Sequence, residues 1–168
     1  PEIDAAVEVT VARRVLEASG AAGVSHLIVM SSATVYGPWP NNAVPLTEDA
    51  PLRPHPDLPL AVQKAEIERL VAEWSIANPD AITAVLRPAT VVADGTGGWL
   101  ARALHATSVL PANEETPIQY LHIDDLAAAV VSVWQSGLDG AVNVAPDGWL
   151  TPTERRALDP VPKVRLPE

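Results

Sequence analysis

Apolar residues recur every fourth position at the start of the chain, and a short apolar run follows them. The repeated residues are Ile3, Val7, Val11 and Val15, with Leu16 beside the last. This spacing, with charged residues in between, predicts an amphipathic helix over residues 3–19 that turns these side chains toward the core. Residues 26–30 are mostly apolar and end at small polar residues, which predicts a strand covered on both faces.

Helical and strand patterns then alternate along the chain. Helices are predicted over 61–77, over 125–136 and near 152–158, and strands over 82–87 and 141–145. The apolar face of the second helix carries Ile67, Leu70, Val71 and Trp74, and its polar face carries Glu66, Glu68, Arg69 and Glu73. The core face of the third helix carries Leu126, Val130, Val131 and Trp134. Alternating helices and strands predict the α/β class with a parallel sheet.

The composition and charge of the chain disfavour several kinds of binding partner. The chain has 168 residues, of which 48% are apolar and 19% are charged, enough for one compact core. Its formal net charge of −10 disfavours nucleic acid and anionic membranes, because both attract basic surfaces. No apolar run approaches the ~18 residues of a membrane span, and no basic leader is visible. There is no cysteine for a disulfide, and we expect a cytoplasmic protein.

Candidate chemistry begins where the first predicted strand ends. Ser31 and Ser32 follow that strand directly. In doubly wound sheets, ligands bind beyond the carboxyl ends of the strands, so these hydroxyls are predicted to border a site. Lys64 lies in the first turn of the next helix, where the positive end of the helix dipole disfavours a cation. From spacing alone, a solvated surface lysine is the simpler interpretation.

A longer pattern changes that interpretation. Ser31-Ser32-Ala33-Thr34-Val35-Tyr36-Gly37 is followed by an acidic, proline-rich loop over 38–59 and then by Gln63-Lys64-Ala65-Glu66. This arrangement resembles the extended short-chain dehydrogenases, specifically the NAD-dependent epimerase/dehydratase family that acts on nucleotide sugars. The resemblance implies the C-terminal part of a Rossmann-like doubly wound parallel sheet with a small substrate-binding region. It also implies NAD or NADP as cofactor and a nucleotide sugar as substrate.

The resemblance also assigns roles to particular residues. Ser32 would polarise the substrate, and Lys64 would bind the nicotinamide ribose and lower the pKa of a tyrosine four residues earlier, so both are predicted to be catalytic. The residues predicted to bind the cofactor are Ser31, Lys64, Pro88 and Thr90, and those predicted to bind the substrate are Thr34, Arg87 and His122. For Arg87, a salt bridge to a nearby carboxylate is an equally good interpretation.

Two parts of the family pattern are missing. The tyrosine position is Leu60, and no tyrosine occurs between Tyr36 and Tyr120. Loss of this general acid or base removes a proton transfer worth about 10²–10⁴-fold in rate. The sequence also contains no Gly-x-Gly-x-x-Gly loop, which holds the dinucleotide pyrophosphate. We therefore expect an N-terminally truncated fold. Its expected parts are a Rossmann-like half over 1–92, a substrate-side region over 93–150 and an irregular tail over 151–168.

Two further segments leave alternatives open. His122, Asp124 and Asp125 are metal ligands by type, but nothing completes a ligand set, so Asp124 or Asp125 is predicted to cap the following helix and no metal is expected. The Gly-rich turn over 94–98 is either a flexible connector or a contact for a substrate phosphate.

Two functions follow from these observations. The first is an NAD(P)-dependent nucleotide-sugar epimerase/dehydratase-like protein, impaired or inactive unless Tyr36, His55 or His122 replaces the tyrosine; for Tyr36, packing is the simpler role. The second is a non-catalytic remnant that binds a ligand or a partner chain and forms a homo-oligomer through an uncovered sheet edge. A serine hydrolase is a poor third option, because Ser32 lacks the Gly-x-Ser-x-Gly elbow.

Overall fold

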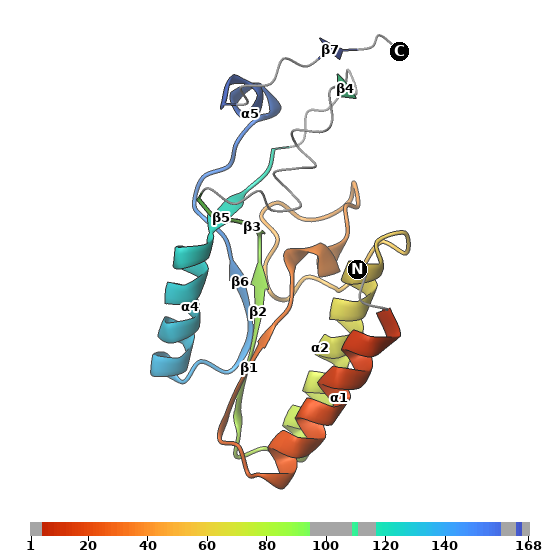
Figure 1. Cartoon of the computed structure of the whole chain (residues 1–168), viewed down its shortest axis with the longest axis vertical. Coiled ribbons are helices and arrows are strands. Elements are labelled where there is room, and N and C mark those ends of the chain that lie inside the picture. Colours follow the sequence, from red (N-terminus) through yellow and green to blue (C-terminus); the bar gives the residue numbers. More distant parts are fainter. Residues whose placement is uncertain (1–4, 95–108, 111–116, 159–163, 166–168) are drawn as a thin grey trace.

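Three parallel strands form the central sheet of the computed structural model, which describes residues 5–94, 109–110, 117–158 and 164–165 (Figure 1). The strands are β1 (His26–Met30), β2 (Ile82–Pro88) and β6 (Gly140–Val144), in the order β1-β2-β6. Val29 lies opposite Val85, and Leu86 lies opposite Val142. Because all three strands run the same way, their carboxyl ends meet at one edge of the sheet. The predicted strands therefore form, with ends shifted by no more than one residue.

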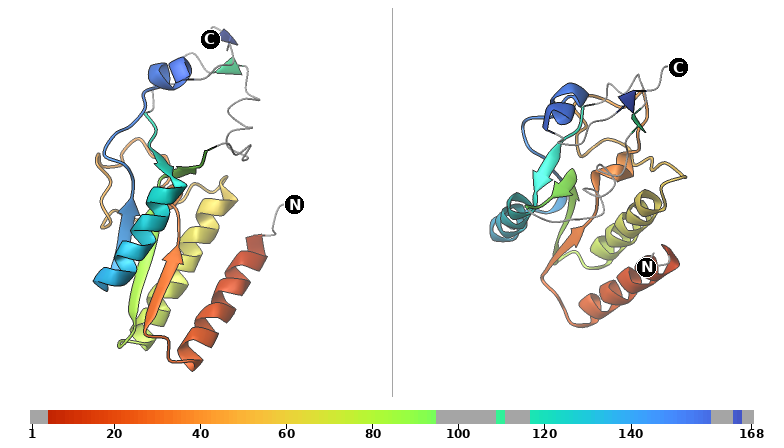
Figure 2. Two further views of the ribbon diagram at one scale, coloured as in Figure 1. Left: turned by 60° about the vertical axis from the view of Figure 1, so that its left-hand side comes forward. Right: turned by 45° about the horizontal axis from the view of Figure 1, so that its top comes forward.

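Helices cover both faces of this sheet (Figure 2). On one face lie α1 (Ala5–Ala21) and α2 (Pro59–Ala77), and on the other lies α4 (Ile123–Ser136). The first core joins Leu16 of α1, Val85 of β2 and the apolar face of α2, which is Ile67, Leu70, Val71 and Trp74 as predicted. The second core joins Ala84, Leu86, Leu121, Leu126, Val133 and Val144. Each fully buried Leu or Val contributes about 1.5–3 kcal/mol, so these two layers stabilise the sheet.

Smaller elements lie at and beyond the carboxyl edge. A 3-10 helix, η1 (Ala33–Tyr36), follows β1. Two short parallel pairs join β3 (Thr90–Val92) to β5 (Tyr120–His122) and β4 (Val109–Leu110) to β7 (Val164–Arg165). The helix predicted near 152–158 is α5 (Pro152–Leu158). Most of the Gly-rich turn over 94–98 lies outside the described residues. Within the described ranges, every helix is too short or too polar to cross a membrane.

Two predicted helix faces are wrong in part, although Leu16, Leu126 and Val130 pack as predicted. In α1, Val7, Val11 and Val15 are 47%, 53% and 51% exposed, and the residues that pack are Val9, Ala12 and Leu16. In α4, Val131 and Trp134 are 49% and 60% exposed, whereas Val133 is buried. Each helix carries apolar residues on more of its circumference than one neighbour can cover. The periodicity alone therefore did not identify which apolar side is buried.

Candidate functional site

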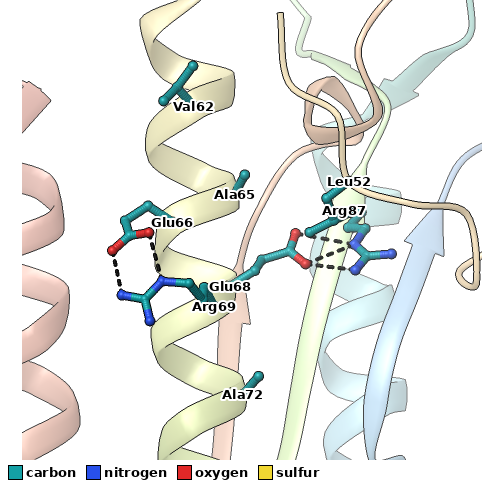
Figure 3. Close-up of a pocket in the computed structure, with 8 residues that line it drawn as sticks. All are labelled: Leu52, Val62, Ala65, Glu66, Glu68, Arg69, Ala72 and Arg87. Atoms are coloured by element: carbon teal, nitrogen blue, oxygen red, sulfur yellow. Dashed lines mark hydrogen bonds and ion pairs between the residues drawn. The ribbon is translucent and has the colours of Figure 1, made fainter. Parts of the chain in front are cut away.

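A buried carboxylate joins three elements at the carboxyl edge of the sheet (Figure 3). Glu68 of α2 accepts hydrogen bonds from Arg87 of β2, with Nη2 at 2.7 Å from Oε2 and Nε at 3.1 Å from the same oxygen. The Ser31 hydroxyl, just after β1, donates to the other oxygen of Glu68. All three side chains are buried. The predicted cofactor residue Ser31 and the predicted substrate residue Arg87 thus meet at one carboxylate, and the salt bridge considered for Arg87 forms.

Arg87 is also bonded to Tyr36. Its Nη1 donates to the Tyr36 hydroxyl at 2.8 Å, and its guanidinium lies 5.2 Å from the centre of the Tyr36 ring. Burial by itself would lower the pKa of Arg87, but the hydrogen bonds to Glu68 and Tyr36 outweigh burial and raise that pKa above its ordinary value. Tyr36 is 2% exposed and donates to Asn143 Oδ1 at 2.7 Å. Its hydroxyl is therefore committed to the interior.

Asn143 fastens the proline-rich loop to β6. Its backbone N–H donates to Glu48 Oε1 at 2.7 Å, and its side-chain amide donates to the Leu46 carbonyl at 3.2 Å. Arg87 Nη1 donates to the Glu48 carbonyl at 3.0 Å. The bond from Asn143 holds the pKa of Glu48 below its ordinary value. One turn of the loop is thus fixed over the ends of β2 and β6.

Ser32 caps the N-terminus of η1, and its side-chain oxygen accepts two hydrogen bonds from Thr34. Its Oγ accepts from the Thr34 backbone N–H at 3.2 Å and from the Thr34 hydroxyl at 2.9 Å. A serine hydroxyl has two acceptor positions and one O–H donor. With both acceptor positions used by Thr34, the Ser32 O–H has no acceptor among the described residues. The predicted substrate residue Thr34 therefore orients the predicted catalytic hydroxyl.

Lys64 points to the seam between α1 and α2. Its Nζ lies 3.5 Å from Glu8 Oε2, and none of the hydrogen bonds or ion pairs among the described residues joins it to Ser32. Leu60, at the tyrosine position one turn earlier, is 42% exposed. The contact from Ser31 to Glu68, which lies one turn beyond Lys64, shows that the end of β1 lies beside this part of α2. The fold therefore brings the helix of Lys64 to the serine pair but directs the amine to Glu8.

Pro88, Thr90 and His122 lie further along the same edge. Pro88 is buried at the end of β2, and Thr90 begins β3. His122, rather than Asp124 or Asp125, caps α4: its Nδ1 accepts from the Asp124 N–H at 3.3 Å. The predicted cap is wrong because β5 runs directly into α4, so the residue before the helix is the last residue of the strand.

The other ring nitrogen of His122 carries the hydrogen if the capping nitrogen accepts. Within the described part of the chain, this Nε2 makes no hydrogen bond and lies 3.7 Å from Asp94 Oδ1. His55, the other histidine considered as an acid, stacks on Trp39 with ring centres 5.4 Å apart. In the described part of the chain, no three His, Asp or Glu side chains gather as a metal site.

An open pocket of about 510 Å³ lies between α2 and the proline-rich loop (Figure 3). Its apolar lining is Leu52, Val62, Ala65 and Ala72, and its charged lining is the pairs Glu66 with Arg69 and Glu68 with Arg87. The buried ion pair of Glu68 and Arg87 thus forms part of the wall of this pocket. Lys64, on the same helix, is turned away from it toward Glu8.

Sequence reasoning missed three residues that organise this edge: Glu8, Glu68 and Asn143. Glu68 was assigned to the polar face of α2 but is 6% exposed. Its position one turn after Lys64 was visible in the sequence, but its partners Ser31 and Arg87 are 37 and 19 residues away. Glu68 becomes buried only because α2 packs against the ends of β1 and β2.

Comparison with known sequences gives a family. A sequence model of the NAD dependent epimerase/dehydratase family matches residues 1–145. Uncharacterised proteins of Mycobacterium bovis and Mycobacterium tuberculosis are 27% identical over 132 residues, which cover 77% of this chain and 35% of each relative. The chain therefore spans about a third of the length of these curated relatives.

Solved structures have the same fold. The chain is similar to TunA, an NAD-dependent NDP-hexosamine 5,6-dehydratase, with a TM-score of 0.73 at 23% identity, over 89% of this chain and 50% of that one. It is similar to the UDP-N-acetylglucosamine 4-epimerase of Methanobrevibacter ruminantium, with a TM-score of 0.73 at 21% identity, over 94% and 55%. The UDP-glucose 4-epimerase of Thermus thermophilus, in complex with NAD, gives 0.69 at 24% identity, over 94% and 55%.

These likenesses confirm the predicted Rossmann-like α/β fold, and the chain spans about half the length of each solved structure. At such identities the structures show the fold alone, and the family comes from the sequence model. Because that model matches 145 of 168 residues, the chain belongs to the NAD-dependent epimerase/dehydratase family.

Proposed function

We propose that this chain binds a nucleotide sugar and NAD or NADP at the carboxyl edge of its sheet, and that it is impaired or inactive as an epimerase or dehydratase as it stands. The observation that carries the proposal is the Ser32 hydroxyl, whose oxygen accepts two bonds from Thr34 while its hydrogen has no acceptor among the described residues. A hydroxyl in that state can donate to a hydroxyl or keto oxygen of a sugar. Family membership supports the ligand class.

The roles of the other residues are those that the family resemblance gives them. Lys64 would bind the nicotinamide ribose, with Ser31, Pro88 and Thr90 along the same edge. Arg87 is already bonded within the protein, so its contribution to the substrate site is to hold Tyr36 and the loop carbonyl of Glu48. At the end of β5, His122 Nε2 has no hydrogen bond among the described residues and lies 3.7 Å from Asp94 Oδ1.

The residues present fit the nicotinamide end of the cofactor better than its pyrophosphate end. When bound, the dinucleotide would accept or donate the hydride. In this chain Ser32 can donate a hydrogen bond to the reacting oxygen, but Leu60 can neither give nor take the proton. The sequence has no Gly-rich loop for the pyrophosphate. Leu60 at the tyrosine position supports the proposal that activity is impaired.

A titration with NADH, followed by nicotinamide fluorescence, tests the proposal, and calorimetry with a UDP-sugar tests the substrate side. Dissociation constants in the micromolar range are expected for at least one ligand. Ser32→Ala should weaken the binding of the UDP-sugar. Ser136→Ala, on α4, is the matched control and should leave that binding unchanged. No binding of either ligand up to millimolar concentration would overturn the proposal.

A specific observation favours a second candidate, a non-catalytic remnant that associates with a second copy. β1 is an edge strand of the sheet, and Met30 at its end is 40% exposed. Val131 and Trp134, one turn apart on α4, are exposed, and so is Leu138, just after the helix ends; we call these three residues the apolar stripe. Edge strands with nearby apolar surface promote association. Sedimentation velocity over a range of concentrations tests this candidate, and a monomer throughout would exclude it. For either candidate we propose a cytoplasmic location, since the chain has no cysteine.

A further inference from the structure

Lys64 is held by the neighbouring helix. Its Nζ lies 3.5 Å from Glu8 Oε2, and the two side chains are only 22% and 32% exposed. Glu8 lies in the first turn of α1, where the helix dipole favours an acidic residue. The two helices pack side by side along a seam that also contains Leu16, Val71 and Trp74. The pair therefore lies at one end of an ordered seam.

Glu8 has no other described partner for its inner oxygen. Oε2 is buried and receives no hydrogen bond. A buried carboxylate oxygen without a donor is costly, and an adjacent cation offsets that cost. Lys64 supplies the cation, so moving its amine to a ligand would leave Glu8 Oε2 uncompensated.

The same helix offers Lys64 no hydroxyl. One turn earlier stands Leu60, which has no polar atom in its side chain. Among the described residues, the polar group that lies beside the amine comes from α1 rather than from α2.

We infer that Glu8 is a positioning residue for Lys64: it holds the amine in the seam between α1 and α2, and a ligand oxygen must compete with it. This inference rests on the proposed function only in taking Lys64 as a ligand-binding residue. It predicts that neutralising Glu8 makes Lys64 more reactive and strengthens any binding that uses its amine.

Acylation of lysine measures this directly, because the chain contains only two lysines, Lys64 and Lys163. The full chain is treated with limiting sulfo-N-hydroxysuccinimide acetate, and acetylation of each lysine is followed by mass spectrometry. In Glu8→Gln, Lys64 should react severalfold faster than in the unmodified protein, while Lys163 reacts at the same rate. The matched control is Glu17→Gln, which removes an exposed carboxylate from the same helix.

A conservative variant separates positioning from a general loosening of α1. Glu8→Asp keeps the charge on a shorter side chain, so Lys64 should react at a rate between those of the unmodified protein and Glu8→Gln. Equal Lys64 rates in Glu8→Gln and the unmodified protein would overturn the inference. So would equal acceleration in Glu8→Asp and Glu8→Gln, because that points to loosening.

NADH titration of the same variants distinguishes the two proposals. Tighter binding in Glu8→Gln, with Glu17→Gln unchanged, supports both. Faster acylation of Lys64 without NADH binding in any variant keeps the positioning role and overturns the nicotinamide assignment. NADH binding together with an unchanged rate of Lys64 acylation in Glu8→Gln keeps the nicotinamide assignment and overturns the positioning role of Glu8.

Discussion

Glu68 Oε2 of α2 lies 2.7 Å from Arg87 Nη2 of β2, and the two side chains are only 5% and 8% exposed. The Ser31 hydroxyl donates to the same carboxylate, and Arg87 extends to Tyr36. Two opposite charges have therefore been taken out of water together. Neither can be removed without leaving the other buried and unpaired.

Glu68→Gln should strongly destabilise the fold. Breaking a buried ion pair by removing one partner costs about 3–5 kcal/mol, because the remaining charge is uncompensated. Urea denaturation followed by circular dichroism measures the free energy of unfolding. The control is Glu66→Gln, which breaks the exposed pair with Arg69 and should cost about 0–1 kcal/mol. Similar losses in the two variants would contradict the interior role of Glu68.

Gly37→Ala should be destabilising for a backbone reason. Gly37 ends η1 with φ of 70° and ψ of 159°, a conformation that side-chain-bearing residues avoid at a cost of about 1–3 kcal/mol. An added Cβ would also collide with the Arg53 carbonyl oxygen and the Trp39 indole nitrogen. Gly148→Ala is the control, since its Cβ would meet nothing within 4 Å and its φ is not positive. Thermal unfolding of both variants should shift the midpoint only for Gly37.

Glu48 should make stability depend on pH in the acid range. The hydrogen bond from the Asn143 N–H lowers the folded-state pKa of Glu48 below 4.5, its ordinary value. Its stabilising contribution is therefore complete above the unfolded pKa and is lost as the pH falls through the folded pKa. Denaturation of the unmodified protein and of Glu48→Gln from about pH 6 to about pH 3 should show the difference between them shrinking at the acid end. A difference that stays constant with pH would rule out this linkage.

Leu60→Tyr should not by itself create turnover. Leu60 is 42% exposed, so a tyrosine fits there with a change in stability of about 0.5 kcal/mol or less. The new hydroxyl restores the acid or base, but the Lys64 amine that would lower its pKa by family resemblance is held by Glu8. Steady-state assays with NAD and UDP-sugars should stay at background. Turnover in this variant would show that the contact of Lys64 with Glu8 does not prevent catalysis.

Trp134→Glu should weaken self-association if the second candidate function holds. Trp134 is 60% exposed on α4, one turn after Val131 and shortly before Leu138, which follows the helix end, so a charge there interrupts the apolar stripe. Trp149→Glu is the control, because Trp149 is 63% exposed but lies outside α4. Sedimentation velocity should give a smaller mean mass for the first variant only. If both variants behave like the unmodified protein, the stripe is not the interface.

The local pattern of the chain determined where the main helices and strands are. The strand over 26–30 and the apolar face of α2 are correct because a strand or a helix face is set by residues a few positions apart. The serine motif determined the family for a similar reason, since its residues are contiguous in the sequence.

Only the tertiary structure decided which polar side chains are buried and which apolar side chains remain exposed to solvent. Glu68 is buried because α2 packs over the ends of β1 and β2, and His122 caps α4 because β5 runs straight into the helix. Lys64 contacts Glu8, 56 positions away along the chain, through the packing of two helices. Such contacts depend on long-range packing, and the periodicity of a single helix carries no information about its partner.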